Sequence, residues 1–258
     1  MNITQRQAEI SELLRQEAFL TIEMLAERFG VTTQTVRRDV NVLCDLGFAR
    51  RRHGGIAPLT TEGNLAYASR QLLNRSGKIY LAQEVARHIP NNSTLSIGIG
   101  TTPEVVASAL LEHKGLRIYT NSLSIANICS VKTDFEINIA GGRLRHEEHD
   151  VLGNSVERFF ESYKTDYGIF GVAGVELDGS LLDFHEEEVR VREQISNNCR
   201  ESFLVLDYQK FGRSAHIRGG DIRDVSKVFC DMSPPKEIVT LLKESTSDLI
   251  VSNKEIAA

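Results

Sequence analysis

The stretch Val31-Thr32-Thr33-Gln34-Thr35-Val36-Arg37-Arg38-Asp39-Val40 decides the fold of the N-terminal part of this chain. Together with Leu43 and Cys44, its apolar residues recur with the spacing of one helix face. The opposite face carries side chains that can donate hydrogen bonds to phosphates and base edges, namely Thr33, Gln34, Arg37, Arg38 and Asn41. The stretch therefore predicts a recognition helix.

Two helices are predicted before it, with apolar stripes at Ile10, Leu13 and Leu14 and at Ile22, Leu25, Ala26 and Phe29. Thr21 and Thr32 can cap the N-termini of the second and third helices. Gly30 and Gly47 are suited to end them, because glycine adopts the left-handed conformation at low cost. A tight turn around Gly30-Val31 then gives helix-turn-helix spacing.

A basic ribbon follows at Arg50-Arg51-Arg52-His53-Gly54-Gly55. Gly54-Gly55 is a hairpin-turn signal, so the three arginines are predicted on a wing that grips the DNA backbone. The alternative is a packing or dimerisation module with a solvated arginine face. The stripe, turn, polar helix face and basic wing together favour DNA binding.

The distribution of charge supports this interpretation. Of the net charge of −5, residues 1–58 carry +1, with eight arginines against seven acidic residues, and the remainder carries −6. A local basic patch, not the overall balance, is what phosphate binding requires.

The 258 residues suffice for two unequal domains. We find no apolar run of transmembrane length and no signal-peptide core, so a cytoplasmic protein is expected. Cys44, Cys129, Cys199 and Cys230 lie in apolar segments without paired spacing. They predict buried reduced thiols, and we expect neither a metal site nor a cofactor.

A linker is predicted at residues 57–64, followed by a helix over 66–88. Beyond it, β-rich runs at 94–99, 116–120, 136–140, 167–173, 202–207 and 226–230 alternate with helical patterns at 103–112, 122–130, 155–163 and 186–198. This order predicts a Rossmann-like α/β domain with a mostly parallel sheet covered on both faces. We expect domains at 3–58 and 75–252, joined by 59–74.

Ligands of such sheets bind at the carboxyl ends of the strands. There the sequence places Gly100-Thr101-Thr102, Asn121-Ser122, Gly141-Gly142 and Lys210. Thr102 is expected to cap a helix with Pro103 in its first turn, so the first loop resembles an anion site. The alternatives are ordinary turns, a helix-capping Asn121 and a surface Lys210.

Residues 3–58 resemble the helix-turn-helix domain of the DeoR family of bacterial sugar-metabolism regulators, through residues 31–40, Leu43 and 52–55. This resemblance implies operator contacts from Thr33, Gln34, Thr35, Arg37, Arg38, Asn41, Arg50, Arg51 and Arg52, with Asp39 orienting an arginine. It continues through Gly100-Thr101-Thr102, Thr120-Asn121-Ser122, Gly141-Gly142, Asp178-Gly179-Ser180 and Lys210-Phe211-Gly212-Arg213. The family's sensor domain is similar in fold to ribose-5-phosphate isomerase and binds sugar phosphates without converting them.

The resemblance implies a homo-oligomeric repressor that a phosphorylated effector releases from double-stranded operator DNA. Residues 99–104, 178–182 and 210–213 favour the family branch that responds to glycerol 3-phosphate, with another sugar phosphate as the alternative. The implied effector contacts are Gly100, Thr101, Thr102, Asn121, Ser122, Gly141, Gly142, Lys210 and Arg213. Family members commonly have Asp where this chain has Gly98, and His185-Glu186-Glu187 also departs from the pattern.

A sugar-phosphate isomerase with an appended DNA-binding domain is a second hypothesis. It would need a general base near a carbon-bound proton. Candidate carboxylates are Asp183, Glu187, Glu188 and Asp207, but Gly98 removes one from the place where it would be most useful. We therefore expect a regulator and not an enzyme.

Overall fold

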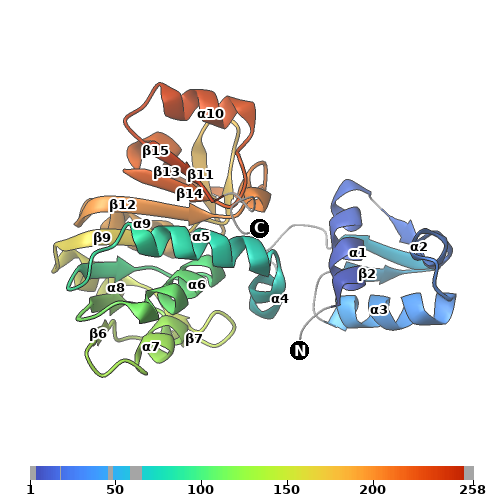
Figure 1. The fold of residues 1–258 in the computed structure, drawn as a ribbon, viewed down its shortest axis with the longest axis horizontal. Helices are drawn as coiled ribbons and strands as arrows, with labels where there is room; N and C mark the ends of the chain where they lie inside the picture. Colours follow the sequence, from blue (N-terminus) through green and yellow to red (C-terminus); the bar gives the residue numbers. More distant parts are fainter. Residues whose placement is uncertain (1–3, 18, 46–48, 59–65, 253–258) are drawn as a thin grey trace. The chain divides into compact units, whose positions relative to one another are not determined.

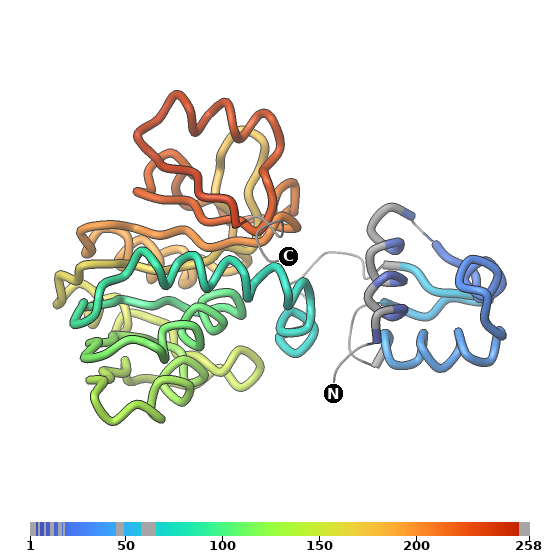
Figure 2. The backbone as a smooth tube through the Cα atoms, viewed as in Figure 1, coloured from blue at the N-terminus to red at the C-terminus, as the bar shows by residue number. Residues whose placement is uncertain are grey.

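A computed structural model of the chain describes residues 4–17, 19–45, 49–58 and 66–252. The chain divides into two compact units, residues 1–73 and 74–258, and each is described by itself. Figure 1 shows their elements, and Figure 2 shows the path of the backbone through them.

The first unit is a winged helix-turn-helix, as predicted. Its three-stranded sheet has the order β1-β3-β2. The predicted apolar stripes form most of its core, in which Ile10, Val36 and Leu43 have no exposed surface. The strands add Leu20, Ala49 and Ile56, which were not in the predicted stripes. The elements are α1 (Gln5–Gln16), β1 (Leu20–Thr21), α2 (Ile22–Phe29), α3 (Thr33–Asp45), β2 (Ala49–Arg52), β3 (Gly55–Pro58) and α4 (Tyr67–Leu72).

The turn between α2 and α3 follows from local residue chemistry. The Thr21 hydroxyl accepts a hydrogen bond from the Met24 amide at 3.1 Å and caps α2. Gly30 ends the helix in the left-handed region, with φ 60°. The Thr32 hydroxyl then accepts from the Thr35 amide at 3.2 Å. These predictions are confirmed, whereas the predicted helix end at Gly47 lies outside the described residues.

The predicted helix over 66–88 is wrong in one respect. It is divided into α4 and α5 (Arg75–Arg87), because Asn74 adopts a left-handed conformation with φ 47° and ψ 39°. Asparagine is one of the few residues with a side chain that tolerate this region, so the turn breaks the helix without a glycine.

The second unit is built around a seven-stranded parallel sheet with the order β15-β14-β12-β9-β4-β5-β6. All six predicted strands belong to it, and β15 is an addition. The sheet elements are β4 (Thr94–Ile97), β5 (Arg117–Thr120), β6 (Glu136–Ile139), β9 (Thr165–Phe170), β12 (Cys199–Leu206), β14 (Lys227–Cys230) and β15 (Asp248–Val251). The helices are α5, α6 (Thr101–Ala109), α7 (Leu123–Cys129), α8 (Asn154–Glu161), α9 (Glu186–Asn197) and α10 (Lys236–Lys243), with short 3-10 turns η1 (Leu110–Glu112), η2 (Tyr208–Lys210) and η3 (Ile222–Asp224).

Helices cover both faces of this sheet (Figure 1). Alternate residues of a strand point to opposite faces, so Phe203 and Val205 pack with α5, α6 and α7, while Leu204 and Leu206 pack with α8, α9 and α10. The predicted α/β class and its doubly covered parallel sheet are confirmed.

The strand order reverses between β4 and β9. From β4 the chain builds outward to β5 and β6, and then returns to β9 and builds in the other direction through β12, β14 and β15. Ligands of open α/β sheets bind beyond the carboxyl ends of the strands at such a switch point. The loop between β4 and α6, Gly98-Ile99-Gly100, lies at this position.

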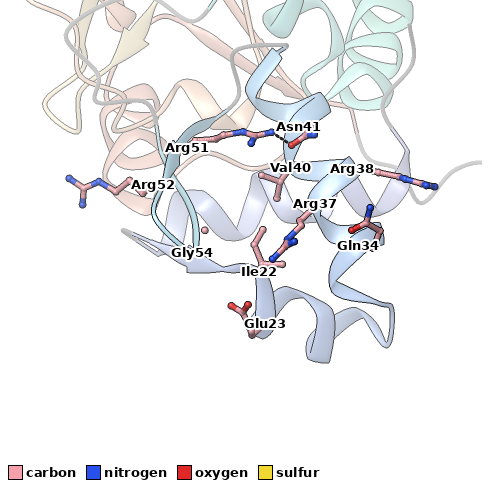
Figure 3. Close-up of a pocket in the computed structure, with 11 residues that line it drawn as sticks. Ile22, Glu23, Gln34, Arg37, Arg38, Val40, Asn41, Arg51, Arg52 and Gly54 are labelled. Carbon is pink, nitrogen blue, oxygen red and sulfur yellow. Dashed lines mark hydrogen bonds between the residues drawn. The ribbon is translucent and has the colours of Figure 1, made fainter.

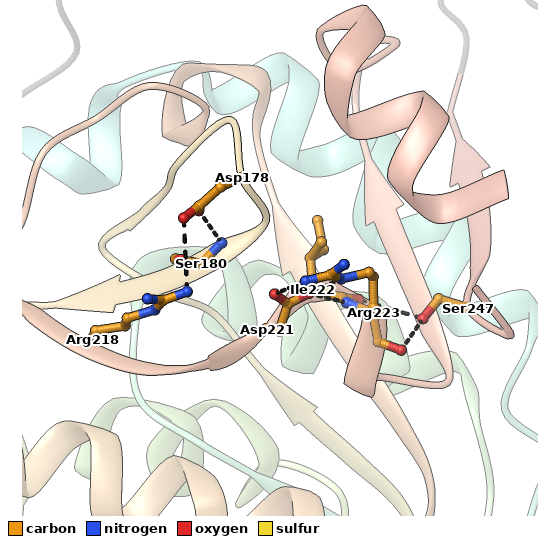
Figure 4. Close-up of polar contacts among 7 residues, drawn as sticks. All are labelled: Asp178, Ser180, Arg218, Asp221, Ile222, Arg223 and Ser247. Atoms are coloured by element: carbon orange, nitrogen blue, oxygen red, sulfur yellow. Dashed lines mark hydrogen bonds and ion pairs between the residues drawn. The ribbon is translucent and has the colours of Figure 1, made fainter. Parts of the chain in front are cut away.

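A smaller antiparallel sheet joins β10 (Gly174–Val175), β11 (Ser180–Asp183) and β13 (Ile217–Asp221), and a short hairpin pairs β7 (Leu144–Arg145) with β8 (Asp150–Val151). The Asp178-Gly179-Ser180 motif forms the turn between β10 and β11, where Gly179 has φ 93°. The Asp178 carboxylate accepts from the Ser180 amide at 2.8 Å (Figure 4). Hydrogen bonding to the Ser180 side chain, and then to its amide, lowers the pKa of Asp178. The motif therefore has a turn-forming role in the structure.

Candidate nucleic-acid interface and effector site

The first candidate site is a groove between α3 and the wing. It is lined by Gln34, Arg37, Arg38 and Asn41 of α3 and by Arg51 and Arg52 of β2 (Figure 3). The recognition-helix face is exposed at Thr33, Gln34, Arg37, Arg38 and Asn41, as predicted from the stripe. Four arginines against one acidic residue, Glu23, make the lining basic, which suits a phosphate backbone.

Arg51 is held against the recognition helix. Its guanidinium donates a hydrogen bond to the Asn41 side-chain oxygen (Figure 3). The strand register explains why, since Arg51 is opposite the buried Ile56 and so shares the core-facing side of the wing. The pair connects the wing with α3 across the groove.

The remaining predicted DNA contacts occupy different positions. Arg50 is opposite Ala57 on the other side of the wing, and its Nε is buried without a hydrogen-bond partner among the described residues. Thr35 is half-buried and its hydroxyl lies 3.0 Å from that of Thr32, at the start of α3. The hairpin turn falls at His53 and Gly54, and Gly55 already begins β3.

Asp39 fixes α3 from the buried side. It is 4% exposed, and its two oxygens accept from Arg6 Nε at 2.6 Å and from Gln7 Nε2 at 2.8 Å. The arginine that Asp39 orients is therefore in α1 rather than in its own helix. Sequence spacing gave no indication of a contact across 33 positions.

The second candidate site lies at the switch point of the large sheet. Gly100 has φ 120° and precedes α6, so the helix begins at Thr101, and the prediction that Thr102 caps it is wrong. Pro103 lies in the first turn, as predicted. Thr101 and Thr102 are 7% and 5% exposed. The amides of a helix N-terminus beside buried hydroxyls favour an anion.

Lys78 of α5 brings a positive charge to this loop. The side chain is buried, and its ammonium donates to the Thr101 hydroxyl at 3.0 Å and lies 4.0 Å from the Asp207 carboxylate. A buried ammonium is costly unless it is paired. Lys78 was not predicted from the sequence. It shares a buried stripe with Leu81, Ala82 and Val85, and a charge within such a stripe was the available signal.

Comparisons with known proteins match both units of the chain. The model of the DeoR-like helix-turn-helix domain matches residues 6–62, and that of the DeoR C-terminal sensor domain matches residues 73–232. The chain belongs to the DeoR family. These matches place the groove in the helix-turn-helix domain, and Lys78 and Thr101 in the sensor domain.

Curated relatives match over nearly the full length of this DeoR-family regulator. It is 42% identical to the glycerol-3-phosphate regulon repressor of Escherichia coli (strain K12) over 95% of this chain and 97% of the relative. It is 39% identical to the repressor of the same name from Haemophilus influenzae, over 97% and 98%. A solved structure of ribose 5-phosphate isomerase A from Neisseria gonorrhoeae overlaps 57% of this chain and 56% of its own, with 13% identity and a TM-score of 0.40.

The other predicted effector residues are distributed along the sheet edge. Asn121 is fully buried, and its amide donates to the Val151 carbonyl at 2.7 Å, while its Oδ1 has no partner within the described part of the chain. Ser122, not Asn121, caps α7. Gly141 and Gly142 follow the edge strand β6, and a Cβ on Gly142 would lie 2.6 Å from Val151. This close approach requires glycine.

Lys210 and Arg213 follow β12. Lys210 ends η2, which is capped by Asp207, the carboxylate near Lys78. Arg213 donates to the Ala173 carbonyl at 3.2 Å, and its guanidinium lies 5.4 Å from the centre of the Phe184 ring. The structure therefore connects Lys210 with the Lys78–Thr101 pair through Asp207, whereas Arg213 contacts the segments after β9 and β11.

A layer of ion pairs lies beside these residues. Arg145 donates to both oxygens of Asp150 at 2.7 Å and to Glu188 at 3.0 Å. Burial raises the pKa of the Glu188 carboxyl, although Arg145 opposes the shift. Burial likewise raises the pKa of Asp183, which accepts from Arg192 at 3.1 Å. The pairs connect the β7–β8 hairpin with α9, and α9 with β11.

No group of metal-binding side chains is present in the described parts of the chain. Among the same residues, no helix has the length and apolarity needed to cross a membrane.

Proposed function

We propose that this DeoR-family regulator represses carbon-metabolism genes and that a phosphorylated effector, glycerol 3-phosphate in the first place, releases it from its operator. The observation that carries the proposal is the buried Lys78 ammonium at the N-terminus of α6, at the switch point of the sheet. The names of relatives at 39% and 42% identity favour glycerol 3-phosphate over other phosphate esters.

On the DNA side, α3 enters the major groove and the wing follows the backbone. Gln34 and Arg37, near the N-terminus of α3, are assigned to base edges, with Arg38 and Asn41 beside them. Arg52, exposed on the wing, is assigned to phosphate. Symmetric operators are read by symmetric proteins, so we propose a homodimer or a tetramer.

On the effector side, the phosphate is assigned to Gly100, Thr101 and Thr102, with Lys78 and Lys210 as cations. Asn121 and Ser122 on the neighbouring strand, and Gly141 and Gly142 beyond it, are assigned to the rest of the ligand, with Arg213 on the opposite side. An ammonium supplies a point charge for phosphate, and its hydrogen bond to Thr101 fixes where that charge lies.

The isomerase alternative is disfavoured by how three of the four candidate carboxylates are engaged. Asp183 accepts from Arg192, Glu188 accepts from Arg145, and Asp207 caps η2 and lies near Lys78. A general base needs a carboxylate that can reach the substrate proton. The relatives quoted above are named as repressors and not as enzymes.

The first experiment is thermal unfolding of the full-length chain with glycerol 3-phosphate, compared with glycerol, ribose 5-phosphate and fructose phosphates. A ligand at 100 times its Kd adds about 2.7 kcal/mol of stability. We expect a rise in Tm with glycerol 3-phosphate and none with glycerol. Stabilisation by a different ester would mean that this ester, and not glycerol 3-phosphate, is the effector. No response to any ester would contradict the proposed site.

The second experiment measures release from DNA. A duplex selected from a random pool by the full-length chain serves as operator, and its Kd is measured with and without the stabilising ester at fixed salt. We expect the ester to weaken binding. An unchanged Kd would contradict effector-controlled repression.

A further inference from the structure

Asn74 is the first residue of the sensor unit, where α4 ends and α5 begins. Its left-handed backbone, with φ 47°, forms the turn between these helices. The effector site and the start of this unit are close in sequence, since Lys78 is four residues further along α5. The side chain of Asn74 makes a contact that neither the DNA groove nor the phosphate loop explains.

That contact is with Asp231, which follows β14. The Asn74 amide donates to Asp231 Oδ2 at 2.6 Å, across 157 positions of sequence. The other oxygen of Asp231 accepts from the Tyr208 backbone amide at 2.7 Å. Asp231 is only 8% exposed. One buried carboxylate thus joins the Asn74 turn to η2, the turn that ends at Lys210.

Gly77 leaves space for this pair because it has no side chain. A Cβ on Gly77 would lie 2.5 Å from Asn74 Oδ1 and 2.5 Å from Asp231 Oδ2, closer than real Cβ atoms come to other heavy atoms. The carboxylate and amide therefore occupy the space that a side chain would fill on the first turn of α5. Lys78 follows directly and turns to Thr101.

Both segments that Asp231 joins also reach the proposed phosphate site. Tyr208 follows Asp207, whose carboxylate lies 4.0 Å from the Lys78 ammonium and caps η2. An anion bound by Lys78 competes with Asp207 for that ammonium. A shift of Asp207 changes the position of η2. It therefore also changes the position of the Tyr208 amide, which donates to Asp231.

We propose that Asp231 is the positioning residue that transmits occupancy of the phosphate site to the turn at Asn74. In this proposal the carboxylate holds Asn74 in one arrangement when Lys78 is paired with Asp207, and in another when Lys78 binds the ester. The inference rests on the proposed function, because it needs an ester at Lys78. Couplings of this kind change affinity by about 5- to 150-fold.

The test uses the full-length chain, the selected operator and glycerol 3-phosphate, or whichever ester stabilises the wild type. Asn74→Gly keeps the left-handed turn but removes the amide, and Asp231→Ala removes the carboxylate without changing the turn residue. We expect both variants to bind operator and to be stabilised by the ester as the wild type is. Release of operator by the ester should fall to less than twofold.

Two further variants complete the design. Asp231→Asn should retain most of the release, because its amide can accept from Tyr208 and donate to the Asn74 amide oxygen. Asn92→Gly is the matched control, since Asn92 is also left-handed, with φ 63°, at the turn between α5 and β4. It should behave as wild type.

The outcomes separate the two proposals. If no ester releases the wild type from the operator, the proposed function is contradicted, and so is the coupling through Asp231. A wild type that is released, with Asn74→Gly and Asp231→Ala released equally well, overturns the role of Asp231 alone. Loss of ester stabilisation in both variants also overturns it, because the two residues would then belong to the binding site.

Discussion

The Lys78 ammonium lies 3.0 Å from the Thr101 hydroxyl and 4.0 Å from the Asp207 carboxylate, inside a domain where all three side chains are buried. The pairing places a full positive charge at the N-terminus of α6, where the helix already favours an anion. Neither feature alone makes a binding site. Together with the switch point of the sheet, they are the basis for the phosphate site proposed at this loop.

The first prediction concerns this charge. In Lys78→Met the effector should bind about 10- to 100-fold more weakly, because a hydrogen bond from a charged group contributes about 1.5–3 kcal/mol. The rise in Tm with ester should shrink accordingly. Since the substitution leaves Asp207 buried without its cation, Lys78→Met with Asp207→Asn provides a variant without that unpaired charge.

Lys243→Met is the control for Lys78, because Lys243 is an exposed lysine of α10. It should leave ester stabilisation unchanged. If Lys78→Met with Asp207→Asn folds and is stabilised by the ester as strongly as the wild type, Lys78 does not bind the phosphate.

The second prediction concerns base recognition. Arg37→Ala should weaken binding of the selected operator by about 1–3 kcal/mol and relax the preference at one base position, while ester stabilisation persists. Arg87→Ala is the control, because Arg87 is an exposed arginine of α5, with its side chain 71% exposed. Equal operator affinity in Arg37→Ala and wild type at fixed salt would remove Arg37 from the interface.

The third prediction concerns the link between Arg51 and Asn41. Without the structure, Arg51 is expected to contact the DNA backbone only, so Arg51→Ala should weaken all sequences alike. The hydrogen bond to Asn41 changes this expectation. Arg51→Ala and Asn41→Ala should each also reduce discrimination between operator and random duplex. The double variant should discriminate between them little less well than either single variant.

This non-additivity is measured as the interaction energy of the double-mutant cycle, which is about 0.5–3 kcal/mol for coupled residues. Arg52→Ala, from the same strand, should lower affinity for both duplexes equally. Strictly additive losses in Arg51→Ala and Asn41→Ala would show that the wing and the helix bind DNA independently.

The features that could be predicted from sequence are those set by local chemistry. The stripe of α3, the cap at Thr21 and the left-handed Gly30 each depend on residues within about one turn, so periodicity and residue type suffice. The alternation of strands and helices likewise predicted the parallel sheet. The order of its strands, and hence the switch point, was not specified by any local pattern.

The features that could not be predicted are contacts between distant segments. Asp39 is held by Arg6, Lys78 contacts Thr101, and Asn74 contacts Asp231, across 33, 23 and 157 positions. Each of these polar side chains would ordinarily be exposed, and only the packing of the elements makes it a buried partner. The Asn74 turn was missed for a different reason, because a helical pattern continues on both sides of it.

The fourth prediction concerns the pH dependence of stability. Asp166, on β9, accepts from the Thr94 amide at 2.9 Å and from the Thr94 hydroxyl at 2.7 Å, which joins β9 to β4. The Thr94 amide hydrogen bond is the main cause of the lowered pKa of Asp166, and Arg200 adds a smaller effect. Because the folded state lowers this pKa, the contribution to stability is present above the ordinary pKa near 4 and is lost as pH falls through the lower folded value.

Asp166→Asn should therefore destabilise the chain at pH 7 by about 0.5–1 kcal/mol, less than the usual contribution of a charged hydrogen bond, because the side chain is 42% exposed and screened by solvent. The difference from wild type, measured by urea unfolding between pH 7 and pH 3, should shrink as the wild-type carboxylate is protonated. Asp248→Asn, at an exposed position of β15, should show no such narrowing. A difference that stays constant over this range would mean that Asp166 acts through its shape and not through its charge.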